Sequence, residues 1–380
     1  MFTYEFLQNY WWAIISLLGG LLVFLMFVQG GNSLIFITKD EEERLLIVNS
    51  TGRKWEFTFT TLVTFGGAFF ASFPLFYSTS FGGAYWVWIL LLVTFVFQAV
   101  SYEFQTKLGN LLGRNTFRTF LLINGCLGPF IVGAAVSTFF TGSDFIVNKA
   151  AVGESLAPTI SVWGNEWHGL EALANPFTIA FGLTVMFLTQ VLGGMYMQGS
   201  IEDERLEGKL VRAVRWTSGL FLAAFLACMA MLLTMPGYAV DSAGVISVEE
   251  YKYLHNFIQT PSVAIIFLLG VLFVLLGIGI QFFGRRKRMS IWLTGAGTVP
   301  AVMSLFLIAG YNGTAYYPSC SDLQSSLTIS NSCSSEFTLR TMAWVSLAIP
   351  FVLAYIFLAW RAIDRRRLTR REMEITEDKY

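Results

Sequence analysis

The chain has 380 residues, of which 55% are hydrophobic and 13% are charged, and its formal net charge at pH 7 is zero. Because soluble domains carry about 25% charged residues, this composition excludes an ordinary soluble enzyme and predicts an integral membrane protein. The zero net charge gives no reason to expect a nucleic-acid partner.

Nine apolar runs follow one another along the chain, and each reaches the length of about 20 residues that a helix needs to cross a bilayer. Only helices and closed barrels satisfy the backbone in hydrocarbon, and continuous runs of this length predict helices. The expected spans lie near residues 11–37, 57–78, 83–103, 117–141, 176–199, 212–235, 262–284, 289–311 and 340–362. The predicted fold class is therefore an all-α membrane protein, with residues 1–380 forming a single polytopic membrane domain.

Few polar side chains interrupt these spans. In the first span Gln29 and Asn32 lie three residues apart and share a helix face, and the third span contains Gln98. Side-chain amides in membrane helices commonly hydrogen-bond to neighbouring helices, at about 0.6–2 kcal/mol each. The alternative is that these amides line a short hydrated path for protons.

Two carboxylates touch the expected spans, both at span ends. Glu56 follows Trp55 at the start of the second span, where it can complement the helix dipole or collect protons. Glu103 ends the third span four residues before Lys107, which is the spacing of an ion pair on a helix surface. We favour Glu56 as the proton-collecting group, because a threonine-rich turn follows it.

The basic residues gather in alternate connections between the spans. These connections are 38–56, 107–118, 205–215, 285–288 and the tail from 361, whereas Lys149, Lys252 and Arg340 lie on the other side. By the positive-inside rule, the N-terminus is expected outside and the C-terminus in the cytoplasm. The first span follows Trp11 and Trp12 without a cleavage site, which predicts a retained helix rather than a signal peptide.

The four cysteines divide into two kinds. Cys126 and Cys228 fall inside spans, where they are expected to pack as small apolar residues. Cys320 and Cys333 fall in the last outside connection, an oxidising location in which they could form a disulfide. Two free thiols are the alternative.

Two outside connections are expected to carry short surface helices. The segment Ser247–Glu250 has the spacing of a capping box before an amphipathic stretch. The apolar residues Trp167, Leu170 and Leu173 recur at helical intervals before Asn175.

Both histidines, His168 and His255, fall in connecting loops. A haem within the bilayer needs axial ligands such as His on facing helices, and membrane catalysts normally keep ionisable groups inside their spans. No zinc spacing, phosphate-binding glycine loop or nucleophile elbow is present either. We therefore expect no catalytic residue, metal or cofactor in this chain, and expect any redox chemistry to belong to a partner.

Three stretches together resemble subunit II of the cytochrome bd-type quinol oxidases. They are Glu43–Ser50 with Trp55, Glu56 and Gly66–Pro74; Asn175–Phe177 with Thr189 and Gln190; and Tyr317 and Pro318 with Ser326–Ser335, Thr338, Leu339 and Met342. The resemblance covers essentially the whole chain, and the third stretch is its most specific part.

This resemblance implies a haem-free subunit of a bacterial inner-membrane complex that oxidises quinol, reduces O2 to water and takes protons from the cytoplasm. It implies nine helices arranged as two four-helix bundles plus one peripheral helix. The partner would be subunit I, which carries haems b and d and the quinol site in a heterodimer. Small single-helix subunits and a structural quinone or lipid are further expectations that remain open.

Within the resemblance, Trp55 and Glu56 match the family's proton entrance, where an aspartate usually follows the Trp. Gln29 and Asn32 replace two family aspartates, Gln98 replaces an arginine, and Thr61 replaces a Trp. Gln29, Asn32, Gln98 and Glu103 thus join Glu56 and Trp55 as proton-pathway candidates. A multi-pass secondary transporter is the alternative function, although such proteins carry ion ligands near the middle of the membrane.

Overall fold

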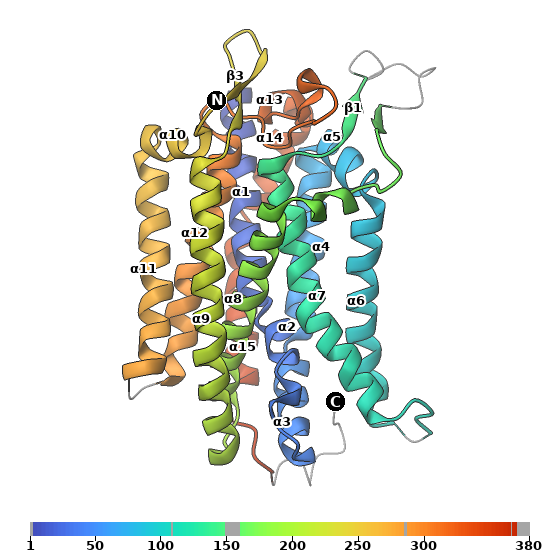
Figure 1. Ribbon diagram of the computed structural model, residues 1–380, viewed down its shortest axis with the longest axis vertical. Helices are drawn as coiled ribbons and strands as arrows, with labels where there is room; N and C mark the ends of the chain where they lie inside the picture. The colour runs from blue at the N-terminus through green and yellow to red at the C-terminus, as the bar shows by residue number, and fades with distance from the viewer. Residues whose placement is uncertain (1–2, 108, 149–159, 285–286, 366, 371–380) are drawn as a thin grey trace.

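The computed structural model describes residues 3–107, 109–148, 160–284, 287–365 and 367–370 as an elongated bundle of roughly parallel helices (Figure 1). Its long helices are α1 (Tyr4–Leu25), α4 (Trp55–Ser72), α6 (Tyr85–Phe104), α7 (Arg114–Thr141), α8 (Pro176–Ser200), α9 (Glu204–Thr234), α11 (Pro261–Phe283), α12 (Ser290–Gly310), α14 (Glu336–Ser346) and α15 (Ile349–Ile363). The shorter helices are α2 (Phe27–Asn32), α3 (Glu41–Gly52), α5 (Pro74–Phe76), α10 (Lys252–Gln259) and α13 (Ile329–Ser332).

Within the described ranges, seven helical segments are long and apolar enough to cross a membrane, or nine if each of two bent helix pairs is one span. This confirms the predicted class of all-helical, multi-pass membrane protein. For two spans, the start expected from hydropathy lies several residues after the residue at which the helix begins. Thr3 caps α1 and Asp203 caps α9 by accepting backbone hydrogen bonds, so both helices begin in polar sequence that hydropathy does not include.

The second expected span is broken rather than continuous to residue 78. Helix α4 ends at Ser72, and the segment Pro74–Phe81 turns away from it by 115°. Proline has no N–H to donate and disfavours helical geometry at the preceding residue, here Phe73. The apolar run continues through this bend, and hydropathy alone therefore gave too long a helix.

The ninth expected span is also bent, because α14 and α15 meet at an angle of 41°. Pro350 stands in the first turn of α15, where its missing N–H is tolerated. In the first span the helix is interrupted at Met26, between α1 and α2.

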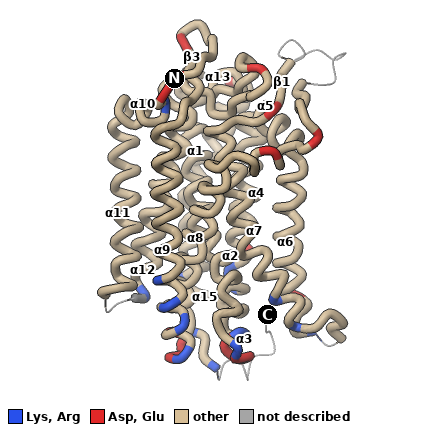
Figure 2. Tube along the Cα trace, viewed as in Figure 1, with Lys and Arg blue, Asp and Glu red and all other residues tan. Residues whose placement is uncertain are grey.

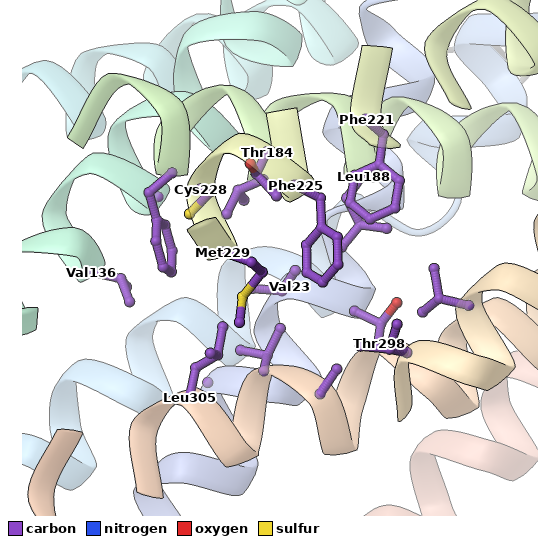
Figure 3. A pocket seen from close by; sticks show the side chains of 18 of the residues that line it. Val23, Val136, Thr184, Leu188, Phe221, Phe225, Cys228, Met229, Thr298 and Leu305 are labelled. Atoms are coloured by element: carbon purple, nitrogen blue, oxygen red, sulfur yellow. The ribbon is translucent and has the colours of Figure 1, made fainter. Parts of the chain in front are cut away.

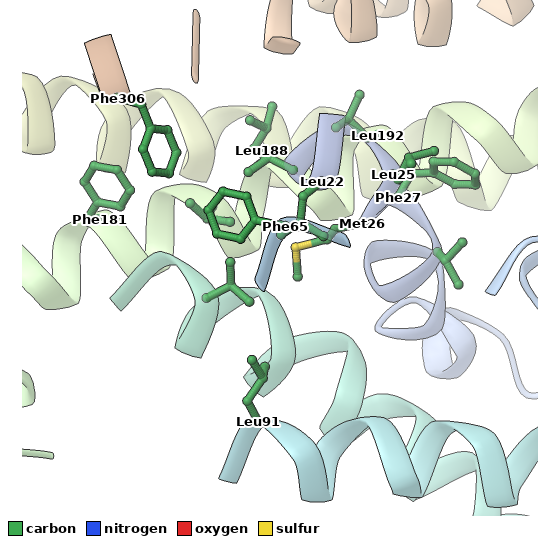
Figure 4. Packing of buried hydrophobic residues seen from close by; sticks show 14 of the residues in the cluster. Leu22, Leu25, Met26, Phe27, Phe65, Leu91, Phe181, Leu188, Leu192 and Phe306 are labelled. Carbon is green, nitrogen blue, oxygen red and sulfur yellow. The ribbon is translucent and has the colours of Figure 1, made fainter. Parts of the chain in front are cut away.

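Close packing of the long helices builds one continuous apolar core (Figure 4). Helix α1 packs on α12 and α4, α8 packs on α7, α9 and α2, and α11 packs on α12. Glycines let two of these backbones touch. A Cβ placed on Gly30 of α2 would lie 1.7 Å from the Thr189 carbonyl oxygen of α8, and one on Gly193 would lie 2.2 Å from the Gly31 nitrogen.

The outer connections contain two hairpins, β1 (Phe145–Val147) with β2 (Ser161–Trp163) and β3 (Gly237–Val240) with β4 (Ile246–Glu249). The predicted capping box at 247–250 is wrong. Ser247 and Glu249 pair within the β3–β4 ladder, and α10 begins after Tyr251, which has a φ of 55°. The other expected surface helix is a single 3-10 turn over Leu170–Ala174, and Asn175 caps α8.

The expected disulfide between Cys320 and Cys333 is not present, since both are free cysteines. Each thiol has its own neighbours instead. The Cys333 sulfur lies 3.0 Å from the Tyr4 hydroxyl and 2.9 Å from Gln8 Nε2, and the Cys320 sulfur lies 3.6 Å from the Thr141 carbonyl oxygen. A spacing of thirteen residues and an outside location do not by themselves bring two thiols together.

Lys and Arg residues gather at the end of the bundle that holds α3, as Figure 2 shows. Six basic residues of the predicted charge pattern lie outside the described residues, namely Lys149, Arg285, Arg286, Arg366, Arg371 and Lys379. At this basic end the acidic start of α3 collects cations from distant elements. Arg118 pairs with Glu41 at 2.6 Å, and Lys209 pairs with the buried Glu43 at 2.5 Å.

The C-terminal segment closes this charge network. Leu368 exchanges backbone hydrogen bonds of 2.8 Å with Ser200 and Glu202, and Arg370 pairs with Asp203 and Glu42, both at 2.6 Å. Partial burial raises the pKa of the Asp203 carboxyl, but hydrogen bonds from Arg370 and the Leu206 N–H more than offset this and hold it below its usual range. The charged form of Asp203 thus favours a docked tail.

Replacing Arg370 with alanine should release the tail from the basic end at neutral pH. In the unmodified chain a depressed carboxyl pKa stabilises docking above the unfolded value of about 3.9 and is lost as the pH falls through the folded value. The tail should therefore stay docked at pH 5 and pH 7. Hydrogen exchange of the peptide around Leu368, corrected for intrinsic rates, measures this. Arg205→Ala, at an exposed neighbouring site, is the control, and equal exchange in both variants would contradict the prediction.

Candidate functional site

Three of the predicted pathway residues lie together in the core near the basic end. Gln29 of α2 and Gln98 of α6 are both fully buried, and Gln29 Nε2 donates a hydrogen bond of 3.0 Å to Gln98 Oε1. Asn32, one turn further along α2, is equally buried. The shared face that the sequence predicts for Gln29 and Asn32 therefore faces the interior of the bundle.

Tyr102 links Asn32 to a second helix. Its hydroxyl lies 2.7 Å from Asn32 Oδ1 and 3.0 Å from the hydroxyl oxygen of Thr51, which belongs to α3. Tyr102 stands one turn after Gln98 on α6, so both contacts with α2 come from one face of that helix. Gln29, Asn32, Gln98, Tyr102 and Thr51 are called the amide cluster below.

Several buried polar atoms of the amide cluster have no protein partner among the described residues. These are Gln29 Oε1, Gln98 Nε2 and Asn32 Nδ2, and the same holds for both polar atoms of Asn124 on α7. Around Gly128 the Asn124 amide approaches the cluster, since a Cβ built there would lie 3.5 Å from Asn124 Nδ2 and 3.9 Å from Gln29 Cγ. Buried polar groups are normally satisfied by protein or ordered water, so this arrangement favours bound water.

The aromatic ring of Trp55 borders the amide cluster, but the two predicted carboxylates do not enter it. The rings of Trp55 and Tyr102 are tilted by 33° to each other, with centroids 6.2 Å apart. Glu56 is exposed on the first turn of α4, with no hydrogen bond or ion pair recorded to another described residue. Glu103 is exposed too and pairs with Lys107 at 3.3 Å, as its spacing indicates.

A buried ion pair lies beside this region, and the sequence pattern did not indicate it. The Lys54 side chain is fully buried, and its Nζ lies 3.2 Å from Asp364 Oδ1 and 3.2 Å from the Trp360 carbonyl oxygen. The same ammonium sits 4.5 Å above the Trp360 ring, and the Tyr196 hydroxyl donates to Asp364 at 3.2 Å. Both charges lie just outside the apolar runs, where the sequence pattern assigned basic residues only a role in topology.

An apolar cavity of about 90 Å³ lies deeper in the bundle, between α1, α7, α8, α9, α11 and α12 (Figure 3). Val23, Leu188, Phe225, Met229 and Leu305 point into it. Apolar cavities of this order stay dry and accept small apolar molecules such as xenon. The cavity is thus suited to a small apolar gas or to part of an apolar chain.

The fold and the two sites define a multi-pass membrane protein with a buried cluster of polar side chains and a separate apolar cavity. A family model described as cytochrome bd terminal oxidase subunit II matches residues 7–363, and the chain belongs to this family. It is thus a member of a quinol oxidase subunit family rather than of a transporter family.

Individual relatives agree with this assignment. The chain is 27% identical to the cytochrome bd-I ubiquinol oxidase subunit 2 of Escherichia coli strain K12, with 98% of each chain covered. It is 23% identical to the cytochrome bd ubiquinol oxidase subunit 2 of Bacillus subtilis, with 96% of this chain and 98% of that one covered. A chain of the bd oxidase structure from Geobacillus thermodenitrificans shares the fold, with a TM-score of 0.61, 14% identity and coverage of 94% and 98%.

Proposed function

We propose that this chain is the haem-free subunit II of a quinol:oxygen oxidoreductase that oxidises quinol, reduces O2 to water and takes up protons from the cytoplasm. It binds a haem-bearing subunit I as a heterodimer, stabilises it and lines routes for protons and oxygen. The match to the subunit II family over residues 7–363 carries this proposal. The C-terminus and the basic end lie in the cytoplasm, and the nine spans form two four-helix bundles and one peripheral helix.

The residues present do not fit a haem. The sequence contains two histidines, and both are engaged in outer connections. His168 Nδ1 lies 2.9 Å from the Gly83 carbonyl oxygen, and His255 Nδ1 lies 2.7 Å from Glu249. Haems b and d are therefore assigned to subunit I in this proposal.

The amide cluster supports a route for protons. Its unpartnered oxygen and nitrogen atoms can bind a short chain of water. Glu56, exposed at the same end of the bundle, collects protons at the surface, and Trp55 separates it from the cluster. Because Gln29, Asn32 and Gln98 cannot titrate, they orient water, and Glu56 is the acid of this route.

The apolar cavity supports a route for oxygen, since a dry cavity of this size accepts a small apolar molecule. Thr61, which replaces a family Trp, is half-buried and bonds only to the Phe57 carbonyl oxygen in the described structure, at 2.7 Å. A structural quinone or lipid chain is a further occupant that this proposal includes.

Purification of the chain from native membranes in mild detergent tests the proposed function. A reduced-minus-oxidised spectrum should show haem that co-purifies in a fixed ratio with a second, larger subunit. A haem-free preparation without a partner would overturn the proposal and would favour the alternative function, a secondary transporter.

Replacing Glu56 with glutamine should slow quinol-driven oxygen consumption about tenfold, equivalent to about 1.4 kcal/mol in the barrier, and leave haem content unchanged. The amide keeps the shape of the side chain but cannot release a proton. Glu204→Gln is the matched control, because it removes an exposed acid in the first turn of α9, at the same end but not among the pathway candidates. Turnover at the unmodified rate in the Glu56 variant would remove Glu56 from the mechanism.

A further inference from the structure

A second, much larger cavity opens at the basic end between α8, α12 and α15. Its volume is about 1080 Å³, which matches the upper range of ligand-binding pockets. Neither the amide cluster nor the apolar cavity of Figure 3 contributes to it. The kind of ligand that it suits therefore follows from its own lining residues.

Three arginines line this cavity without any ion pair recorded in the described part of the chain. They are Arg288 before α12, Arg361 near the end of α15 and Arg365 just after it. Among the described residues of the lining, the one acidic residue is Asp364, whose carboxylate is already paired with Lys54 at 3.2 Å and bonded to Tyr196. The cavity thus presents an excess of positive charge with bidentate donors, which suits phosphate oxygens.

Backbone groups around the cavity do not cancel this charge. The C-terminal carbonyls of α8 would repel an anion, but Arg367 donates to the carbonyl oxygens of Gln198 and Gly199, at 3.2 Å and 3.1 Å. The first turn of α12 also lines the cavity, and the N-terminal end of a helix favours negative charge. Both features strengthen the preference for an anion.

Exposed apolar side chains of α12 and α15, the elements that carry or adjoin the three arginines, also line the cavity. Phe357 and Leu358 of α15 are 57% and 64% exposed, and Trp292 of α12 is 49% exposed. Tryptophan is typical of the boundary between hydrocarbon and headgroups. A ligand that satisfies both the arginines and these apolar side chains has an anionic phosphate head and apolar tails, which a free phosphate ion lacks.

We propose that this cavity is a binding site for one anionic phospholipid of the cytoplasmic leaflet, with the phosphate held by Arg288, Arg361 and Arg365 and the acyl chains lying along α15. Basic pockets between membrane helices on the cytoplasmic side are suited to such headgroups. The site belongs to this subunit and is separate from the proposed proton and oxygen routes.

Native mass spectrometry of the intact complex, released from detergent with limiting lipid, tests the site. Phosphatidylglycerol should be retained at one molecule per chain in preference to phosphatidylcholine. Replacing the three arginines together with glutamine should reduce its retention by at least about tenfold. The matched control replaces Arg114, Arg205 and Arg212, three exposed arginines at the same end but outside the cavity, and should retain the lipid.

Three outcomes would overturn the proposal. Equal retention in the arginine variant and its control would show that the cavity does not hold the lipid. Equal retention of phosphatidylcholine, which has the same phosphate but no net charge, would show that the net negative charge of the lipid is not recognised. Protection of the complex from heat by inorganic phosphate, to the same degree as by phosphatidylglycerol, would assign the site to free phosphate. The lipid selectivity of the unmodified complex keeps the test valid if the triple variant fails to fold.

Discussion

Replacing Gly30 with alanine should prevent stable packing of α2 on α8 and should be among the most damaging single-methyl additions in the chain. The new Cβ would lie 1.7 Å from a backbone carbonyl oxygen, that of Thr189, which cannot rotate away as a side chain can. The two helices would have to separate, which costs about 3 kcal/mol or more. The apparent melting temperature of the purified complex should fall by several degrees.

The matched control for this prediction is Gly279→Ala on α11, where a Cβ would meet nothing within 4 Å. Alanine is the better helix former by about 1 kcal/mol, so this variant should melt at the same temperature as the unmodified protein or higher. Gly193→Ala should behave like Gly30→Ala, because its Cβ would lie 2.2 Å from the Gly31 nitrogen on the other side of the same contact. Unchanged melting of both variants would refute the close backbone contact.

Replacing Asp364 with asparagine should destabilise the basic end more than replacing Lys54 with methionine. The Lys54 side chain is fully buried, whereas that of Asp364 is 27% exposed. Removing the carboxylate leaves a buried ammonium facing a carbonyl oxygen and the Trp360 ring, and the loss of one partner of a buried pair costs about 3–5 kcal/mol. Removing the lysine leaves a carboxylate that water can reach, so the cost should be smaller.

The double variant, with both substitutions, decides whether the pair acts as a unit. Its melting temperature should be close to that of Lys54→Met alone, because no buried charge remains to be compensated. Additive losses in melting temperature would show that Lys54 and Asp364 contribute independently. Thermal unfolding of the four proteins in the same detergent provides the measurement.

The helices were predictable from the sequence because every span in hydrocarbon must satisfy its own backbone hydrogen bonds, which a helix does without help from its neighbours. Hydropathy located α6, α7, α8, α11 and α12 closely. It misplaced the starts of α1 and α9, where polar caps extend the helix into water, and it missed the bend at Pro74, where the run stays apolar through a change in direction.

The site was predictable only in part. Spacing along one helix placed Gln29 and Asn32 on a common face, and the structure brings Gln98 to them. Spacing along one helix cannot show which residues of other helices contact it. Tyr102 and Thr51, which complete the amide cluster, and Asn124, which lies beside it, are ordinary polar residues in their own segments. The disulfide prediction was wrong for the same reason, because two cysteines that are close in the sequence can be held apart by contacts with other residues.

The docked tail also bears on how the protein is made. Arg370 contacts Glu42 across a sequence separation of 328 residues, so the basic end is closed by the last described residues to leave the ribosome. Glu41 and Glu43 can pair with Arg118 and Lys209 before the tail is made, whereas the pair between Glu42 and Arg370 can form only after every helix has been synthesised. A chain that ends before residue 370 would therefore lack the contacts that tie Glu42 and Asp203 together at the basic end.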